Sequence, residues 1–215
     1  MEEWYSLYKG GSGEIEEKKS RFIANIAPVT SVEEANEYIA SIKKQYWDAR
    51  HNCSAFCIGD DGMTTRCSDD GEPSGTAGRP MLEVLTREKI TNVCVVVTRY
   101  FGGTLLGTGG LVRAYQAAVK AGLENCSILK KISGAFVEIK CDYTDFGKIQ
   151  FMCSSNDYYI DDVEYGEAVT VKALITADKL EEFTKDVSNV TSGKAVLSEP
   201  QYVTYSMIDN KPMLF

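Results

Sequence analysis

The hydrophobic pattern is most distinctive in the middle of the chain. Residues 93–97 (VCVVV) form an unbroken apolar run rich in branched side chains, which is typical of a strand buried on both faces. Farther on, Val112, Tyr115, Val119 and Leu123 recur at the spacing of one helix face. The pattern therefore predicts a buried strand and an amphipathic helix, with a glycine-rich loop between them.

Weaker periodicities extend the prediction over the rest of the first half. Ser31 is placed to cap a helix that runs to about Tyr46, with Glu33 and Glu34 in its first turn, where negative charge is favoured. The other expected elements are two short strands within residues 14–29, a hairpin of strands 53–58 and 63–68 around the turn Gly59-Asp60-Asp61-Gly62, and a short helix at 81–85 with Thr76 as its candidate cap.

Residues 131–215 follow a different rhythm. Their pattern predicts a strand, a helix, two strands, a helix and a strand, which is the ferredoxin-like βαββαβ order. Together with the first half, this order indicates an α+β protein of two domains, residues 1–130 and 131–215. The expected elements are strands at 135–141, 158–163, 169–176 and 195–207, and helices at 143–153 and from an Asp178 cap to residue 190.

The composition is ordinary for a soluble globular protein, with 44% hydrophobic and 25% charged residues. No apolar run approaches the ~20 residues of a membrane span, and the acidic start Met1-Glu2-Glu3-Trp4 lacks a signal-peptide core. Seven cysteines, an odd number scattered through apolar patterns, fit reduced thiols better than a disulfide framework. We therefore expect a cytoplasmic protein that does not contact a membrane.

The distribution of charged residues limits the part of the chain to which an anionic partner can bind. The net charge of −8 argues against a surface that coats a long polyanion. Residues 1–130 carry 15 basic and 17 acidic side chains, a balance of −2, whereas residues 131–215 carry 8 and 14, a balance of −6. All seven arginines lie in the first part: Arg21, Arg50, Arg66, Arg79, Arg87, Arg99 and Arg113. Any phosphate-binding face therefore belongs to the first domain.

The glycine-rich loop is the strongest candidate for such a face. A helix that begins without side chains offers unpaired N–H groups and partial positive charge, which attract anions. Arg99 and Arg113 bracket the loop, and a planar guanidinium suits phosphate. Strand alternation sends either Tyr100 or Phe101 outward, where the ring can stack on an unpaired base. The expected anion or nucleic-acid contacts are Arg79, Arg99, Tyr100, Gly102, Gly103, Gly107, Gly109, Gly110 and Arg113.

A purely structural interpretation of the same residues stays open. The glycines match neither the dinucleotide fingerprint nor a P-loop, because no Gly-Lys-Ser/Thr follows them. In this interpretation their role is purely structural: they allow tight turns and close contact between a strand and a helix. Tyr100 and Phe101 can likewise both be core residues.

A second group of polar residues precedes the loop. Asp69, Asp70 and Glu72 can bind magnesium or supply an acid and a base, although such residues beside Gly and Pro more often build turns. His51, the only histidine, shares a predicted strand face with Cys53, so a zinc site or a Cys–His nucleophile is an alternative to simple packing. We expect no catalytic residue, no metal and no cofactor. The candidate polar site consists of His51, Asp69, Asp70, Glu72 and Thr76.

The longest motifs resemble those of a known family, the YigZ/IMPACT family. The resemblance covers about residues 15–125, and the second half resembles the second domain of the bacterial, two-domain branch. Five strings carry it: residues 68–80 (SDDGEPSGTAGRP), 97–103 (VTRYFGG), 106–115 (LGTGGLVRAY), 19–24 (KSRFIA) and 51–53 (HNC).

This resemblance implies a first domain built as a two-layer α/β sandwich, of the kind shared by a small-ribosomal-subunit protein and the GHMP kinases. It implies a second domain like the last domain of elongation factor G. Eukaryotic members act in translation control by binding an activator of a starvation-responsive kinase. We therefore expect a translation-associated regulatory protein that binds RNA, the ribosome or another phosphate-bearing partner through the loop, with a protein partner for the second domain. A small phosphate-handling enzyme and a plain protein-interaction module are the alternatives.

Overall fold

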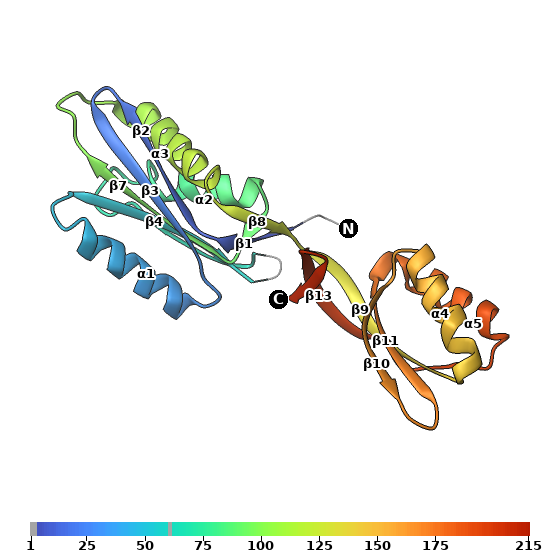
Figure 1. Ribbon diagram of the computed structural model, residues 1–215. Coiled ribbons are helices and arrows are strands. Elements are labelled where there is room, and N and C mark those ends of the chain that lie inside the picture. Colours follow the sequence, from blue (N-terminus) through green and yellow to red (C-terminus); the bar gives the residue numbers. More distant parts are fainter. Residues whose placement is uncertain (1–3, 60–61) are drawn as a thin grey trace. The chain divides into compact units, whose positions relative to one another are not determined.

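The computed structural model describes residues 4–59 and 62–215 (Figure 1). The chain divides into two compact units, Met1–Lys130 and Lys131–Phe215, each with its own hydrophobic core. The turn expected at Gly59-Asp60-Asp61-Gly62 includes two residues outside the described ranges. Within those ranges, no helix is long and apolar enough to cross a membrane.

An antiparallel sheet of five strands forms the centre of the first unit. In spatial order its strands are β2 (Gly11–Glu17), β3 (Ser20–Pro28), β7 (Val93–Tyr100), β4 (His51–Ile58) and β5 (Thr64–Ser68). The apolar run at residues 93–97 lies in the middle strand, β7, and is fully buried, as predicted. β7 pairs with β3 on one side and with β4 on the other, so its end is fixed by two neighbours.

Helices cover both faces of this sheet (Figure 1). α1 (Val32–Gln45) packs on one face, and α2 (Gly78–Arg87) and α3 (Gly107–Leu123) pack on the other. In β7, Val96 belongs to the core beneath α1 and Val97 to the core beneath α2 and α3. The expected two-layer sandwich is therefore wrong. Because successive side chains of a strand point to opposite faces, a strand that is apolar at both needs a helix on each side.

The two capping predictions for this unit had different outcomes. Ser31 caps α1, as predicted, because its hydroxyl accepts the N–H of Glu34 at 3.1 Å. Thr76 does not cap α2: its hydroxyl donates to the carbonyl oxygen of Pro73 at 2.7 Å instead.

Asp69 supplies the acceptor at the start of α2 from outside the helix. Its carboxylate accepts the N–H groups of Gly75, Ala77 and Gly78 at 2.8 to 3.0 Å. Burial alone would raise the pKa of Asp69, but the three backbone hydrogen bonds outweigh it and hold the pKa below its usual value of 3.8. The loop before α2 is thereby tied to the helix that follows it.

α3 begins earlier than the pattern predicted. The apolar residues indicated a helix from Val112, whereas α3 begins at Gly107 and contains Gly109 and Gly110 in its first turn. Glycine has no side chain to carry the apolar period, so the pattern could not extend over these positions.

A second sheet of the first unit has three short strands. They are β1 (Tyr5–Lys9), β6 (Ile90–Thr91) and β8 (Ser127–Lys130). β1 lies in the middle, parallel to β6 and antiparallel to β8. None of the three was predicted, because strands of two to five residues are too short to show a period of two.

The second unit is an antiparallel sheet with two helices on one face (Figure 1). Its strands are β9 (Ile132–Cys141), β10 (Tyr159–Tyr165), β11 (Val169–Thr176), β12 (Val196–Leu197), β13 (Gln201–Ile208) and β14 (Lys211–Leu214), and its helices are α4 (Tyr143–Ser155) and α5 (Leu180–Thr191). The spatial order is β10-β11-β9-β13-β14, and β12 also pairs with β9. Both helices therefore follow a strand and return the chain across the same face.

Two predictions for the second unit are corrected. The long strand expected at residues 195–207 is two strands, because Pro200 has no N–H to pair and interrupts the ladder. Asp178 does not cap α5: it lies in a 3₁₀ turn, Ala177–Lys179, and the residue that precedes the helix is Lys179.

Replacing Asp69 with Ala should lower the free energy of unfolding by about 1–2 kcal/mol at about pH 7, since three N–H groups lose their acceptor. The stabilisation is present while the carboxyl is ionised and is lost as the pH falls through its lowered folded-state pKa. The gap between wild type and variant should therefore close below about pH 4 in urea unfolding followed by circular dichroism. Asp69→Asn, which keeps one acceptor oxygen, should lie between the two. A gap of equal size at all pH values would contradict this role.

Candidate anion-binding site

A cavity of about 220 Å³ opens at the end of the central strand of the first unit. It is lined by Arg50, His51, Arg99, Phe101 and Leu105. His51 is the first residue of β4 and Arg50 precedes it, Arg99 lies near the end of β7, and the loop before α3 carries the other two. His51 and Arg99 are direct neighbours across the pairing of β4 with β7, so the register of the sheet brings them together.

Arg99 is the buried cation of this cavity, with 7% of its surface exposed. Its Nη1 donates to Oε1 of Glu72 at 2.6 Å, and the Tyr115 hydroxyl donates to the same oxygen at 2.9 Å. Nε of Arg99 has no hydrogen-bond partner among the described residues. Nε is itself buried from solvent, so a ligand oxygen reaches it only when the side chains around it move. Because an unpaired buried donor is costly, an oxygen that then accepts from Nε is bound favourably.

The three acidic residues of the predicted polar site are bound within the protein. Glu72 neutralises Arg99, Asp69 holds the start of α2, and Asp70 accepts Nζ of Lys43 at 2.6 Å and a backbone N–H of β4 at 2.7 Å. In the described part of the chain, no group of three or more His, Cys, Asp or Glu residues is arranged to hold a metal ion. The three carboxylates fix the loop that carries Glu72.

His51 and Thr76, the other members of the predicted polar site, are separated in the structure. Nδ1 of His51 lies 2.9 Å from the carbonyl oxygen of Asp70. Because a carbonyl only accepts, Nδ1 carries the proton, and Nε2 is the ring nitrogen that a ligand can contact. Thr76 is buried, and its hydroxyl donates to the carbonyl oxygen of Pro73. His51 therefore belongs to the cavity, whereas Thr76 supports the loop.

Cys53 lies next to the same network. Its sulfur lies 3.2 Å from the Tyr115 hydroxyl oxygen and 3.0 Å from the carbonyl oxygen of Asp69. Burial raises the pKa of the Cys53 thiol to about 12, so the thiol stays protonated at neutral pH. A Cys–His pair with His51 therefore has no thiolate to use, and Cys53 acts as a small packed residue.

The start of α3 offers free N–H groups beside this cavity. Leu105, which lines the cavity, is followed by Leu106, the residue that precedes the helix and has no side-chain acceptor. Among the described residues, no side chain caps α3 and no carbonyl outside the helix accepts its first N–H groups. Gly107 enters the helix with φ +71°, a left-handed conformation that glycine adopts without strain. The helix therefore presents partial positive charge at this end.

The glycines of the loop have different roles. A Cβ at Gly102 would lie 2.0 Å from the carbonyl carbon of Lys19, so the close approach of two chain segments requires glycine there. A Cβ at Gly109 would meet only Nη1 of Arg113, at 3.6 Å, so the exposed Arg113 guanidinium lies over the first turn of α3. Arg113 forms no ion pair with any described residue. Gly103 and Gly107 have positive φ angles, +85° and +71°, that favour glycine. A Cβ at Gly110 would lie 2.9 Å from Cβ of Leu106, so close packing favours glycine there.

Neither Tyr100 nor Phe101 is buried, so the expectation that strand alternation sends one of the two rings inward is wrong: β7 ends at Tyr100, and Phe101 belongs to the loop that follows. Tyr100 donates its hydroxyl to Asp48 at 2.8 Å and has the Arg21 guanidinium over its ring. Phe101 is 52% exposed, lines the cavity, and its ring centre lies 5.7 Å from the Arg99 guanidinium. The ring presented to a ligand in the cavity is therefore that of Phe101.

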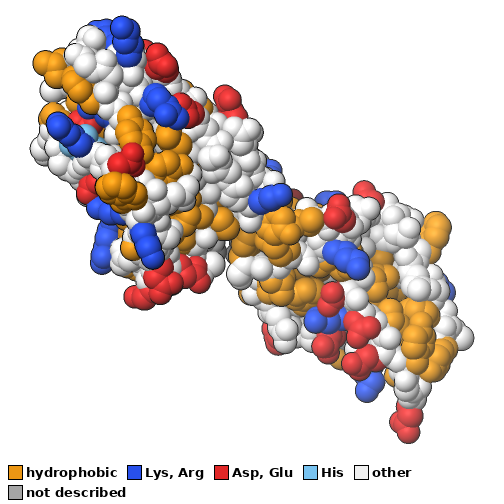
Figure 2. Space-filling model, turned by 60° about the vertical axis from the view of Figure 1, so that its left-hand side comes forward, with side chains coloured by type: hydrophobic (Ala, Val, Ile, Leu, Met, Phe, Trp, Pro, Cys, Tyr) orange, Lys and Arg blue, Asp and Glu red, His pale blue; other side chains and the backbone are white. Residues whose placement is uncertain are grey.

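The structure gives Arg79 and Arg50 positions that the sequence did not indicate. Arg79 is exposed on the first turn of α2, pairs with Glu83 at 3.4 Å, and is not among the residues that line the cavity. Arg50 lines the cavity, and its place beside His51 at a strand start was the signal that could have found it. Figure 2 shows that Lys and Arg side chains lie next to exposed hydrophobic side chains on the surface of the first unit.

Comparison with protein families matches both units. The family described as the Impact N-terminal domain matches residues 18–123, and the family described as a domain of unknown function (DUF1949) matches residues 139–194. All five residues that line the cavity fall within the first match.

Several relatives cover most of the chain. The IMPACT family member YvyE of Bacillus subtilis (strain 168) is 38% identical over 205 residues, which are 95% of this chain and 94% of the relative. The IMPACT family member YigZ of Escherichia coli (strain K12) is 36% identical and covers 84% of this chain and 89% of its own. Protein IMPACT of Mus musculus is 36% identical over 43% of this chain and 30% of its own length. A solved structure titled "Crystal structure of an hypothetical protein" covers 92% of this chain and 97% of its own, with 35% identity and a TM-score of 0.58.

Replacing Glu72 with Gln should lower the free energy of unfolding by about 3 kcal/mol, because the buried Arg99 guanidinium loses its counterion. Urea unfolding measures the loss. The double variant Glu72→Gln, Arg99→Gln should lose at least about 1 kcal/mol less than the sum of the two single variants, since it removes both charges. The exposed pair of Arg21 with Glu14 is the matched control, and Glu14→Gln should cost less than about 1 kcal/mol. Additive losses at Glu72 and Arg99 would show that the two side chains are not coupled.

Proposed function

This chain belongs to the IMPACT family, and from that membership we propose that it is a translation-associated regulatory protein whose first unit binds RNA. The binding site is the cavity at the end of β7 together with the start of α3. A backbone phosphate binds to Arg99 and to the free N–H groups of the helix, and an unpaired base stacks on Phe101.

The observation that supports this proposal most strongly is the unpartnered Nε of Arg99. The atom belongs to a buried side chain that lines the cavity, and Glu72 accepts from only one nitrogen of the same guanidinium. Phosphate oxygens are the acceptors that a guanidinium fork binds best. The uncapped start of α3 and the exposed Arg113 add further donors for the same anion.

The size of the cavity favours one group of a polymer over a complete small molecule. Sites for drug-sized ligands measure about 300–1,000 Å³, whereas this cavity measures about 220 Å³. A phosphate group occupies it while the rest of the strand extends over the surface. The exposed ring of Phe101 at its border supports recognition of an unpaired base, which is how single-stranded RNA is commonly bound.

The second unit supports a different kind of contact. Residues 131–215 carry 8 basic and 14 acidic side chains, so their balance of −6 favours a protein partner over RNA. The strand order, in which β11 lies between β9 and β10, supports a ferredoxin-like domain similar to the last domain of elongation factor G. We place the domain boundary between residues 130 and 131, where the two compact units meet in sequence.

Arg113→Ala and Arg50→Ala should each weaken binding of a fluorescein-labelled oligouridylate by about 3- to 10-fold, because each removes a phosphate contact. Fluorescence anisotropy measures the affinity. In a salt titration, the slope of log K against log salt concentration should become shallower by about 0.7 for each lost contact with a single strand. Both arginines are exposed, so the fold is expected to persist.

Arg87→Ala is the matched control, since Arg87 is an exposed arginine of the same unit at the end of α2. It does not line the cavity, and its removal should leave both affinity and salt slope unchanged. Wild-type affinity in both Arg113→Ala and Arg50→Ala would overturn the proposal, as would an equal loss in Arg87→Ala.

A further inference from the structure

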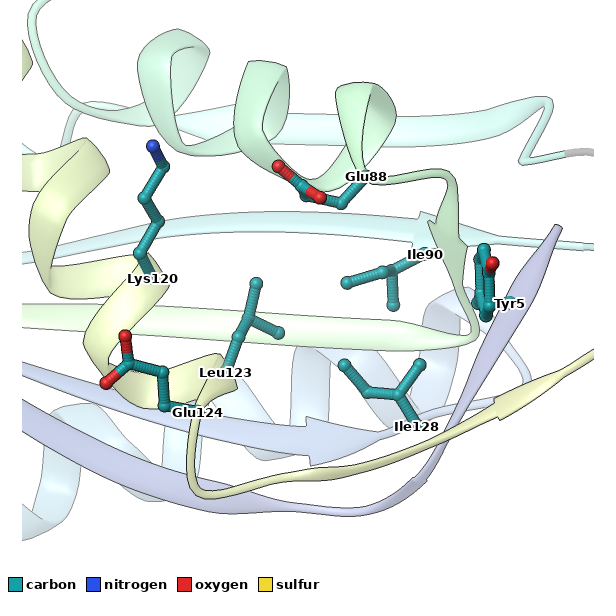
Figure 3. A pocket seen from close by; sticks show the side chains of 7 residues that line it. All are labelled: Tyr5, Glu88, Ile90, Lys120, Leu123, Glu124 and Ile128. Carbon is teal, nitrogen blue, oxygen red and sulfur yellow. The ribbon is translucent and has the colours of Figure 1, made fainter. Parts of the chain in front are cut away.

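A larger cavity, of about 550 Å³, lies at the C-terminal ends of α2 and α3, whereas the anion site lies beside the start of α3 (Figure 3). It is lined by Tyr5, Glu88, Ile90, Lys120, Leu123, Glu124 and Ile128. These residues come from the two helix ends and from the small sheet of β6, β1 and β8. The cavity thus has no part in the proposed RNA site.

The floor of this cavity is apolar. Ile90 is 4% exposed, and the side chains of Ile90, Leu123 and Ile128 point toward one another across the middle of the cavity (Figure 3). The Tyr5 ring closes one end. A ligand that binds here therefore buries an apolar body against three aliphatic side chains.

The rim of the cavity is charged in an unusual way. Glu88 and Glu124 are the residues that follow the last residue of α2 and of α3. Negative charge is unfavourable there, because the last carbonyls of a helix already carry partial negative charge. Two helices nevertheless place a carboxylate at the same cavity, whereas Lys120, in the last turn of α3, occupies a position that favours a cation.

These charges are available to a ligand. Glu88 has only the neighbouring Arg87 nearby, at 4.0 Å in an exposed pair. Lys120 and Glu124 form no ion pair with any described residue. Arg87 and Lys120 offset the two carboxylates in formal charge, and the partial negative charge of two helix C-termini leaves the rim weakly negative.

We propose that this cavity binds a small organic cation, an ammonium or guanidinium group on an apolar stem. Glu88 and Glu124 hold the charge, and Ile90, Leu123 and Ile128 hold the stem. The volume lies within the range of about 300–1,000 Å³ that is usual for small-molecule sites. The proposal is independent of RNA binding, because none of its residues belongs to the anion site.

Phenethylammonium is the probe that tests it. In a titration of the full-length protein followed by methyl NMR, the signals of Ile90, Leu123 and Ile128 should shift and saturate with a dissociation constant of about 1 mM. Phenethyl alcohol, which has the same stem without the charge, and 3-phenylpropionate, which has the opposite charge, should each bind at least about tenfold more weakly. Equal binding of the alcohol, or shifts confined to other methyl groups, would overturn the proposal.

Variants at the rim give a second test in which the two signs of charge act oppositely. The double variant Glu88→Gln, Glu124→Gln should weaken phenethylammonium binding about tenfold or more, whereas Lys120→Gln should strengthen it by about threefold. Glu37→Gln, at an exposed carboxylate on α1, is the matched control and should bind like wild type. All four positions are exposed, so the variants should fold. Wild-type binding by the double variant would contradict the proposal.

Discussion

The buried ion pair between Arg99 and Glu72 is the interaction on which the candidate site depends. It joins the central strand to the loop that Asp69 ties to α2, and the Tyr115 hydroxyl adds α3 to the same carboxylate oxygen. A buried charge needs such a counterion, but this counterion occupies only one nitrogen of the guanidinium. The interaction that connects these elements therefore also leaves a buried, unpaired donor, Nε of Arg99. The Arg99 side chain lines the same cavity as the exposed ring of Phe101 and as Leu105, which lies just before the uncapped start of α3.

Much of the fold could be predicted because its signals are local. The apolar run of β7, the Ser31 cap of α1 and the helical spacing that ends at Leu123 each depend on residues close in sequence. The features that were missed depend on distant or very short segments. Asp69 reaches α2 across a loop, β1 pairs with strands far along the chain, and the third layer follows only when both faces of β7 are counted.

The candidate site could be predicted only in outline. Arg99 and the loop glycines stood out in the sequence, but the partner of Arg99, Glu72, lies 27 residues away, and no pattern connects the two. The register of β4 against β7 pairs His51 with Arg99, and Arg50, next to His51, lines the same cavity. Arg79 lies on α2 and is not among the residues that line it. Alternation could not show which of Tyr100 and Phe101 meets a ligand, because β7 ends at Tyr100; only the fold shows that Tyr100 is bound to Asp48 and that Phe101 lines the cavity.

The central claim is that Nε of Arg99 donates to a phosphate of bound RNA, and NMR of the arginine side chains tests it most directly. The Nε–H signal of Arg99 is followed while oligouridylate is added to the ¹⁵N-labelled protein, with Arg99→Lys used to assign the signal. The account predicts that this signal shifts, saturates at the RNA concentration that saturates anisotropy, and exchanges more slowly with water. An Nε–H signal that keeps its free position when the protein is saturated with RNA would contradict the account.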